Sequence, residues 1–111
     1  MHDLDKALAF ANYQVTLTEQ KKLLKQKFDD ACIVASNGGL FQITLTFLSG
    51  IKTISEEAQW VQDANGNPIW IADIGEFVTV CYNTYHNALS VYGQSYEQLK
   101  KQRSVKSLVG L

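Results

Sequence analysis

Histidine and cysteine are the residue types here best suited to nucleophilic or metal chemistry, and the chain of 111 residues has two of each. His86 follows Cys81 by five residues in a predicted helix, which turns the two side chains to different faces, whereas a cysteine–histidine nucleophilic pair requires contact. His2 and Cys32 add no spacing typical of a structural zinc site. We therefore expect no catalytic residue, no metal ligand and no cofactor, and interpret both cysteines as buried hydrophobic residues.

The acidic segments carry equally little catalytic signal. The segment 63–68, Asp-Ala-Asn-Gly-Asn-Pro, faintly resembles a calcium loop, but counted from Asp63 its glycine is fourth and its twelfth position is Ile74. A calcium loop of the EF-hand type has glycine at its sixth position and glutamate at its twelfth, so a turn is the simpler interpretation. We expect the protein not to be an enzyme. A hydrolase or transferase would need a pocket that brings His86 together with a carboxylate.

Basic residues form two clusters that could contact phosphate groups. The expected phosphate contacts are Lys21, Lys22, Lys25, Lys100, Lys101 and Arg103. Lysine attracts phosphate without sequence preference, and a single arginine is poorly suited to bidentate reading of bases. The net charge of −1 also lacks the basic excess of a dedicated nucleic-acid binder. The clusters therefore indicate either ordinary solvated helix surface or, as the alternative function, a nucleic-acid accessory protein.

The elements that would position these side chains are mainly helical. From Ile74 to Leu99 the apolar residues recur at steps of three and four, which predicts an amphipathic helix. Asp73 is the expected N-cap, with Glu76 three residues later. We predict that this helix extends to Lys101 and that a docked or loosely helical tail follows.

The first third of the chain also predicts a helix, from Asp3 to Ser36. Its apolar positions are Leu4, Leu8, Ala11, Val15, Leu17, Leu24, Phe28, Ala31 and Ala35. The segment 36–39, Ser-Asn-Gly-Gly, is expected to end it, because glycine and asparagine adopt the left-handed conformation at low cost.

The middle of the chain fits two interpretations. We favour a short strand over Leu40–Ile43, a helix over Leu45–Trp60 that Thr44 could cap, and an extended segment Ile69–Ile71 that could pair with the strand. The alternative is a longer strand at 40–48, because Phe41, Ile43, Leu45 and Phe47 alternate with polar residues.

Together these elements predict a single domain, 1–111, of the mainly α class. It has two long helices, a shorter central helix and a minimal two-stranded β element; an α+β fold is the alternative. The two long helices exceed the dimensions of a compact domain of this size. They must form an elongated hairpin, or project and be covered by another subunit.

Tyrosines on the last helix favour the second arrangement, because rings with polar tips suit partly wet interfaces. The expected interface residues are Tyr85, Tyr92, Tyr96, Arg103 and Leu108. We expect a homo-oligomer, most simply a two-fold dimer. No apolar run reaches the length needed to cross a bilayer, and the acidic N-terminus is unlike a signal peptide, so we expect a cytoplasmic protein without a membrane partner.

Three short segments resemble small uncharacterised proteins of large tailed phages of the T4 type, especially marine ones. They are residues 37–43 (Asn-Gly-Gly-Leu-Phe-Gln-Ile), 63–69 (Asp-Ala-Asn-Gly-Asn-Pro-Ile) and 101–106 (Lys-Gln-Arg-Ser-Val-Lys). The resemblance implies a virus-encoded protein, made in a bacterial cytoplasm, that joins a virion or binds a host or phage protein. It implies no activity. The function expected from the sequence is that of a non-enzymatic, oligomeric interaction or assembly protein.

Overall fold

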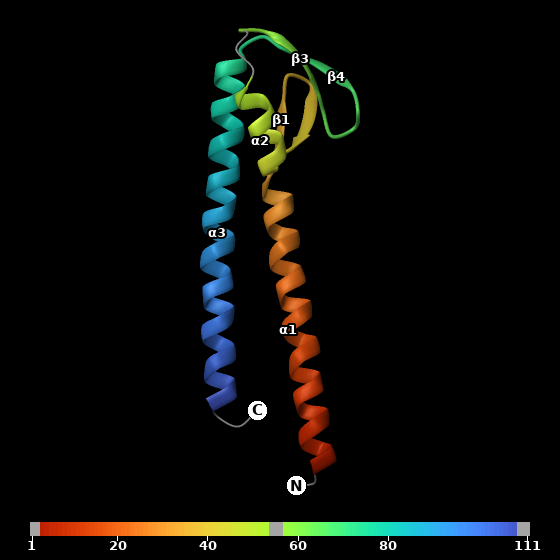
Figure 1. The fold of residues 1–111 in the computed structure, drawn as a ribbon, viewed down its shortest axis with the longest axis vertical. Coiled ribbons are helices and arrows are strands. Elements are labelled where there is room, and N and C mark those ends of the chain that lie inside the picture. The colour runs from red at the N-terminus through yellow and green to blue at the C-terminus, as the bar shows by residue number, and fades with distance from the viewer. Residues whose placement is uncertain (1–2, 54–56, 109–111) are drawn as a thin grey trace.

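The protein is a long helical hairpin with a small head of strands and one short helix at its closed end (Figure 1). This computed structural model describes residues 3–53 and 57–108. The elements are α1 (Asp3–Ala31), β1 (Ile33–Ser36), β2 (Gly39–Gln42), α2 (Leu45–Lys52), β3 (Gln59–Gln62), β4 (Pro68–Ile71) and α3 (Ile74–Leu108). The expected mainly α class with minimal β structure is confirmed. The alternative strand at 40–48 is wrong, because α2 begins at Leu45.

The hairpin of α1 and α3 makes the molecule a rod rather than a sphere. Its principal extents are 68 × 23 × 20 Å and its radius of gyration is 20.4 Å, whereas a compact domain of this length has a radius near 13 Å, about two thirds of that value. The single chain therefore contains the elongated hairpin, which is one of the two arrangements expected for long helices. α1 begins and α3 ends at its open end, far from the head (Figure 1).

The first strand pair replaces the expected end of the first helix. That helix ends at Ala31, not at Ser36, because the β-branched pair Ile33 and Val34 favours an extended backbone. Asn37 and Gly38 have φ values of 54° and 83°, the left-handed conformation that both central residues of a type I′ hairpin turn require. β1 and β2 then pair antiparallel on either side of this turn, so the predicted helix stop is a hairpin turn.

The second strand pair corrects the expected β pairing. β4 pairs antiparallel with β3, with Trp60 opposite Trp70, and not with the segment 40–43. The two hairpins nevertheless touch, since the Ala64 N–H donates to the Leu40 carbonyl oxygen at 2.7 Å. The Asp63 carboxylate accepts hydrogen bonds from the N–H groups of Asn67, Leu40 and Asn65, which lower its pKa. One side chain thus fixes its own turn and joins it to β2.

Capping side chains define where the other helices begin. The Thr44 hydroxyl accepts from the Phe47 N–H at 3.1 Å, and Asp73 Oδ1 accepts from the Glu76 N–H at 3.0 Å, which confirms both predicted N-caps. The helix expected over 45–60 is α2 alone and ends at Lys52, and Trp60 lies in β3. α3 exceeds its expected end at Lys101 and continues to Leu108.

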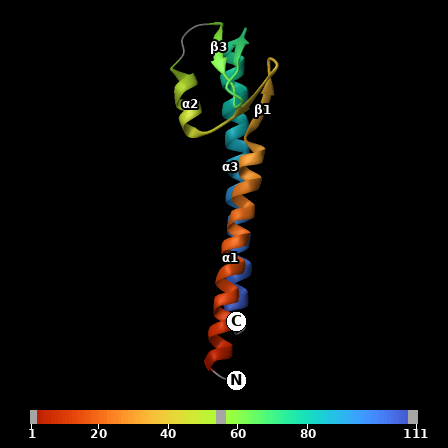
Figure 2. The ribbon, with the colours of Figure 1, turned by 90° about the vertical axis from the view of Figure 1, so that its right-hand side faces the viewer.

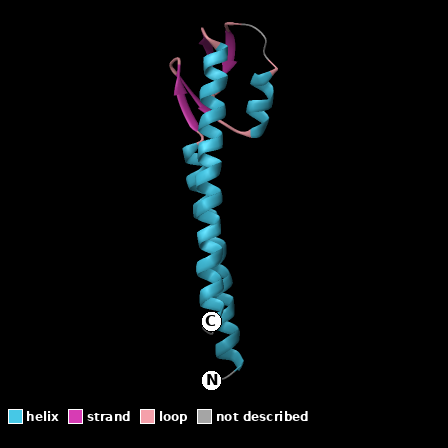
Figure 3. Ribbon diagram, turned by 90° about the vertical axis from the view of Figure 1, so that its left-hand side faces the viewer, coloured by secondary structure: helices cyan, strands magenta, loops and turns pink. Residues whose placement is uncertain are grey.

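The buried core lies in the head, between the two β-hairpins, α2 and the first turns of α3. Its most deeply buried side chains are Cys32, Phe41, Ile43, Ile71 and Cys81. The Phe41 ring meets the Phe77 ring edge to face at a centroid distance of 4.8 Å. Figures 2 and 3 show α2 on one side of the upper part of α3 and β1 on the other. The head thereby joins α1 to α3 and sets the spacing at which these two helices leave it.

The contact between the two β-hairpins gives a first prediction. A Cβ added at Gly39 would lie 2.6 Å from Ile69 Cγ1, so we expect Gly39→Ala to lower the free energy of unfolding by about 1–3 kcal/mol, the usual cost of overpacking. Gly93, in the middle of α3, has no atom near the equivalent position. Gly93→Ala should raise the same quantity by about 1 kcal/mol. Urea denaturation measures both variants, and a Gly39→Ala protein as stable as the wild type would contradict the close contact with Ile69.

Candidate functional site

The surface most distinctive of this molecule is the shaft, defined as α1 with residues 81–108 of α3. Along α1 the half-buried residues recur at steps of four and three: Ala9, Tyr13, Leu17, Gln20, Leu24 and Phe28. The matching positions of α3 are Cys81, Tyr85, Ala88, Tyr92, Leu99 and Arg103. This is the spacing of two antiparallel helices packed along one seam. The seam brings together residues that are as many as 90 positions apart in the sequence.

The other face of α1 remains uncovered. Leu4, Leu8, Ala11 and Val15 fall within about 60° of one another around the helix and about 180° from the seam, at 3.6 residues per turn. Leu4 is 69% exposed, Leu8 55% and Val15 62%. We call these four residues the outer stripe. The sequence analysis listed them with Leu17, Leu24 and Phe28 as apolar positions of one helix, and the structure shows that these positions lie on two opposite faces of it.

Near the head, an aromatic cluster holds the seam together. The Phe28 ring stacks on the Tyr92 ring at 5.0 Å and meets the Tyr85 ring edge to face at 5.7 Å. Tyr85 is only 8% exposed, and Tyr92 is half-buried. Two of the tyrosines expected at an interface therefore contact this chain's own α1.

Near the open end, Arg103 joins the helices with polar contacts. Its Nε donates to Gln20 Oε1 at 3.1 Å, and its Nη2 donates to the same oxygen. The guanidinium lies 4.8 Å from the centre of the Tyr13 ring, and the Tyr13 hydroxyl is within 3.5 Å of the Arg103 carbonyl oxygen. Arg103, expected to contact phosphate or a partner, is thus buried among α1 side chains. The planar guanidinium of Arg103 donates two hydrogen bonds to Gln20 and also contacts the Tyr13 ring, so the contact fixes the relative positions of these three side chains.

Between these two contacts, lysines from both helices meet at one tyrosine. The Lys21 ammonium lies 5.8 Å from the centre of the Tyr96 ring, and the Lys100 ammonium lies 5.7 Å from it. Both distances are within the range of cation–π attraction. The two basic clusters, about 80 residues apart in sequence, therefore form one positive patch around the half-buried Tyr96.

Acidic neighbours reduce the charge of this patch. Lys22 lies 3.8 Å from Glu19 and Lys100 lies 3.4 Å from Glu97. Lys25 donates to Asp29, a hydrogen bond that raises the pKa of Lys25. Lys101 is exposed. These pairs are solvent-exposed and individually weak, so the patch remains a modest source of positive potential.

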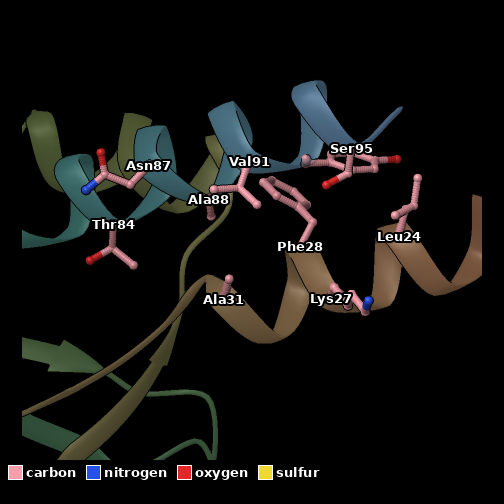
Figure 4. A pocket seen from close by; sticks show the side chains of 10 residues that line it. Leu24, Lys27, Phe28, Ala31, Thr84, Asn87, Ala88, Val91 and Ser95 are labelled. Carbon is pink, nitrogen blue, oxygen red and sulfur yellow. The ribbon is translucent and has the colours of Figure 1, made fainter. Parts of the chain in front are cut away.

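A groove runs along one flank of the shaft close to the head (Figure 4). It has a volume of about 410 Å³. Its lining residues are Leu24, Lys27, Phe28, Ala31, Thr84, Asn87, Ala88, Val91, Tyr92 and Ser95. The lining is mostly apolar or small, and no histidine, cysteine or carboxylate contributes to it. The groove therefore offers packing space between the two helices.

The two cysteines are buried in the core of the head, whereas His86 is exposed. Cys32 and Cys81 are buried as free thiols, and burial raises the pKa of the Cys81 thiol to about 11. His86 lies on the surface of α3 beside the Tyr82 ring, at 4.2 Å. Among the residues that the structure describes, no three of histidine, cysteine, aspartate and glutamate lie close enough to hold a metal ion. In the same residues, no helix has the length and apolar character needed to span a bilayer.

One predicted interface residue has a side chain that the structure does not describe, and two residues of the seam were missed by the sequence analysis. Leu108 is the last residue of α3, and its side chain is outside the described part of the molecule. Gln20 and Tyr13 hold Arg103 but carry no chemical signal of their own. Their spacing from Leu17, Leu24 and Phe28 is the signal that could have assigned them to a seam.

Known proteins give no guide to these surfaces. No protein-family model, no curated protein and no solved structure matches the chain. The outer stripe, the lysine patch and the groove have to be interpreted from their own chemistry.

The Arg103 contact gives a second prediction. Arg103→Lys removes the Nε donor and the planar group that stacks on Tyr13, so we expect the free energy of unfolding to fall by about 1–2 kcal/mol. Lys101→Gln, at an exposed neighbouring position, should change it by about 0.5 kcal/mol or less. Chemical denaturation monitored by circular dichroism measures both. Equal effects of the two variants would show that the contact adds nothing to the hairpin.

Proposed function

We propose that this protein is a non-enzymatic interaction or assembly protein that works as a homo-oligomer, with the shaft as its associating part. The observation that carries the proposal is the amount of uncovered apolar surface on the long helices. α1 is 29 residues long and has no buried residue, although a helix is normally stabilised by burying an apolar face. Self-association would bury the apolar surface that the pairing of α1 with α3 leaves exposed.

The total surface supports this proposal. The chain exposes 7781 Å², whereas a compact monomer of its mass exposes about 6,100 Å². The surplus of about 1,700 Å² is roughly twice what each partner contributes to an interface of standard size. Large apolar side chains are part of it, and in the shaft they are Leu4, Leu8, Phe10, Val15, Leu23, Tyr82, Leu89 and Val91.

The biological setting follows from the resemblance to small proteins of T4-type tailed phages. In that setting the protein is virus-encoded, acts in the host cytoplasm and joins a virion or binds a host or phage protein. A rod that pairs through its sides suits assembly, because it can join bodies at its two ends.

The third prediction concerns oligomeric state. Light scattering coupled to size-exclusion chromatography should give a molar mass of twice the chain's 12.4 kDa or a higher multiple, because apolar surface of this extent favours association. The measured mass should fall on dilution. A mass of one chain at every concentration that stays in solution would contradict the proposal.

The second candidate function is nucleic-acid binding, and the lysine patch around Tyr96 favours it. Positive groups beside an aromatic ring can attract a phosphate backbone and stack on a base. Lys21 and Lys100 come from different helices, so the patch requires the folded hairpin. Its acidic neighbours make it the weaker candidate.

The fourth prediction tests this patch. If it binds nucleic acid, fluorescence anisotropy with labelled single-stranded DNA or RNA should show affinity that falls steeply with salt, with a logarithmic slope near −0.7 for each phosphate contacted. Lys21→Gln with Lys100→Gln should weaken binding and flatten the slope. Lys6→Gln, elsewhere on α1, is the matched control. An absence of binding at low salt would eliminate this candidate.

A further inference from the structure

We infer that the outer stripe of α1 is the self-association surface, and that it pairs antiparallel with the same stripe of a second copy. This inference rests on the proposed self-association and adds where the contact forms and in which direction. Leu4, Leu8, Ala11 and Val15 follow steps of four, three and four, the spacing of a helix–helix seam. Because α3 covers the opposite face of α1, this stripe has no partner within the described residues of its own chain.

The stripe is complementary to itself in the antiparallel direction. Its midpoint lies between Leu8 and Ala11. Two copies related by a two-fold axis at that midpoint place Leu8 beside Ala11 of the second copy and Leu4 beside Val15 of the second copy. Each pair joins a larger side chain to a smaller one, which keeps the distance between the helices even and fills the space between them. No apolar residue of the stripe is left without a counterpart.

Charge selects the same direction. α1 begins with two acidic residues, Asp3 and Asp5, in its first turn. Parallel pairing in register would bring the four carboxylates of two copies together, which is unfavourable. Antiparallel pairing brings Asp5 to the level of Gln14 of the second copy along the helix axis, and so separates the acidic turns. It also opposes the two helix dipoles.

The extent of the stripe limits the overlap. It ends where Thr18 and Lys22 occupy the next positions of the same face. The apolar contact is therefore about 17 Å long, from the 1.5 Å rise per residue, and involves only the N-terminal half of α1. The heads then lie at opposite ends of the dimer, and the groove and the lysine patch remain uncovered.

The fifth prediction tests the surface with two matched leucine variants. Leu8 is 55% exposed and belongs to the stripe, whereas Leu23 is 61% exposed and lies about a quarter-turn away on the same helix. Leu8→Lys should raise the dimer dissociation constant about tenfold or more, because it places a charge in the apolar contact. Leu23→Lys should leave the constant unchanged. Sedimentation measures association, and far-UV circular dichroism confirms that both variants keep their helices.

A distance measurement tests the direction. A spin label on Gln26→Cys, with the native thiols buried, should report a separation of about 50 Å between copies in the antiparallel dimer. Parallel pairing in register would give about 10 Å. A separation of about 10 Å, or a dimer dissociation constant that Leu8→Lys does not raise, would overturn this inference but leave the proposed self-association intact. A wild-type protein that stays monomeric overturns the proposed function as well.

Discussion

Two helices packed side by side can bury only one stripe on each of them. In this protein that constraint governs the rest of the structure. The seam between α1 and α3 uses one face of α1 and leaves Leu4, Leu8 and Val15 in solvent. The apolar core is instead concentrated in the head, around Phe41, Ile71 and Cys81. The head is therefore the region that holds the two helices in place, and the shaft is the region whose surface is left for other contacts.

Contacts along the seam change character with distance from the head. Close to it, Phe28, Tyr85 and Tyr92 form an aromatic cluster. Near the open end, Arg103 uses hydrogen bonds and a ring contact to reach α1. A directional contact at that point fixes the register of the hairpin where little apolar area is buried. This explains why a residue expected to face outward is enclosed by its own chain.

The sequence was sufficient for the helical class, the two long helices and the caps at Thr44 and Asp73, because periodicity and capping are local properties. It left open whether the long helices pack on each other or are covered by a second subunit. It was insufficient where local signals compete. At Ile33 and Val34 the spacing of apolar residues still fits a helix. The strand propensity of these two residues and the turn at Asn37–Gly38 favour a β-hairpin instead. Which strands pair with each other depends on contacts across the head. The residues around Trp60 and Ile69 therefore do not reveal from their local sequence that β3 pairs with β4. The lysine patch around Tyr96 likewise arises only when the hairpin closes.

The opposed tryptophans of the second β-hairpin have a consequence for spectroscopy. Trp60 and Trp70 are the chain's two tryptophans, both lie in the head, and their rings are 5.2 Å apart. Indole emission is therefore a local reporter of the region that closes the hairpin, while ellipticity at far-ultraviolet wavelengths comes mainly from α1 and α3. Melting curves recorded with the two signals would coincide if head and shaft unfold as one cooperative unit, and would separate if the open end frays first.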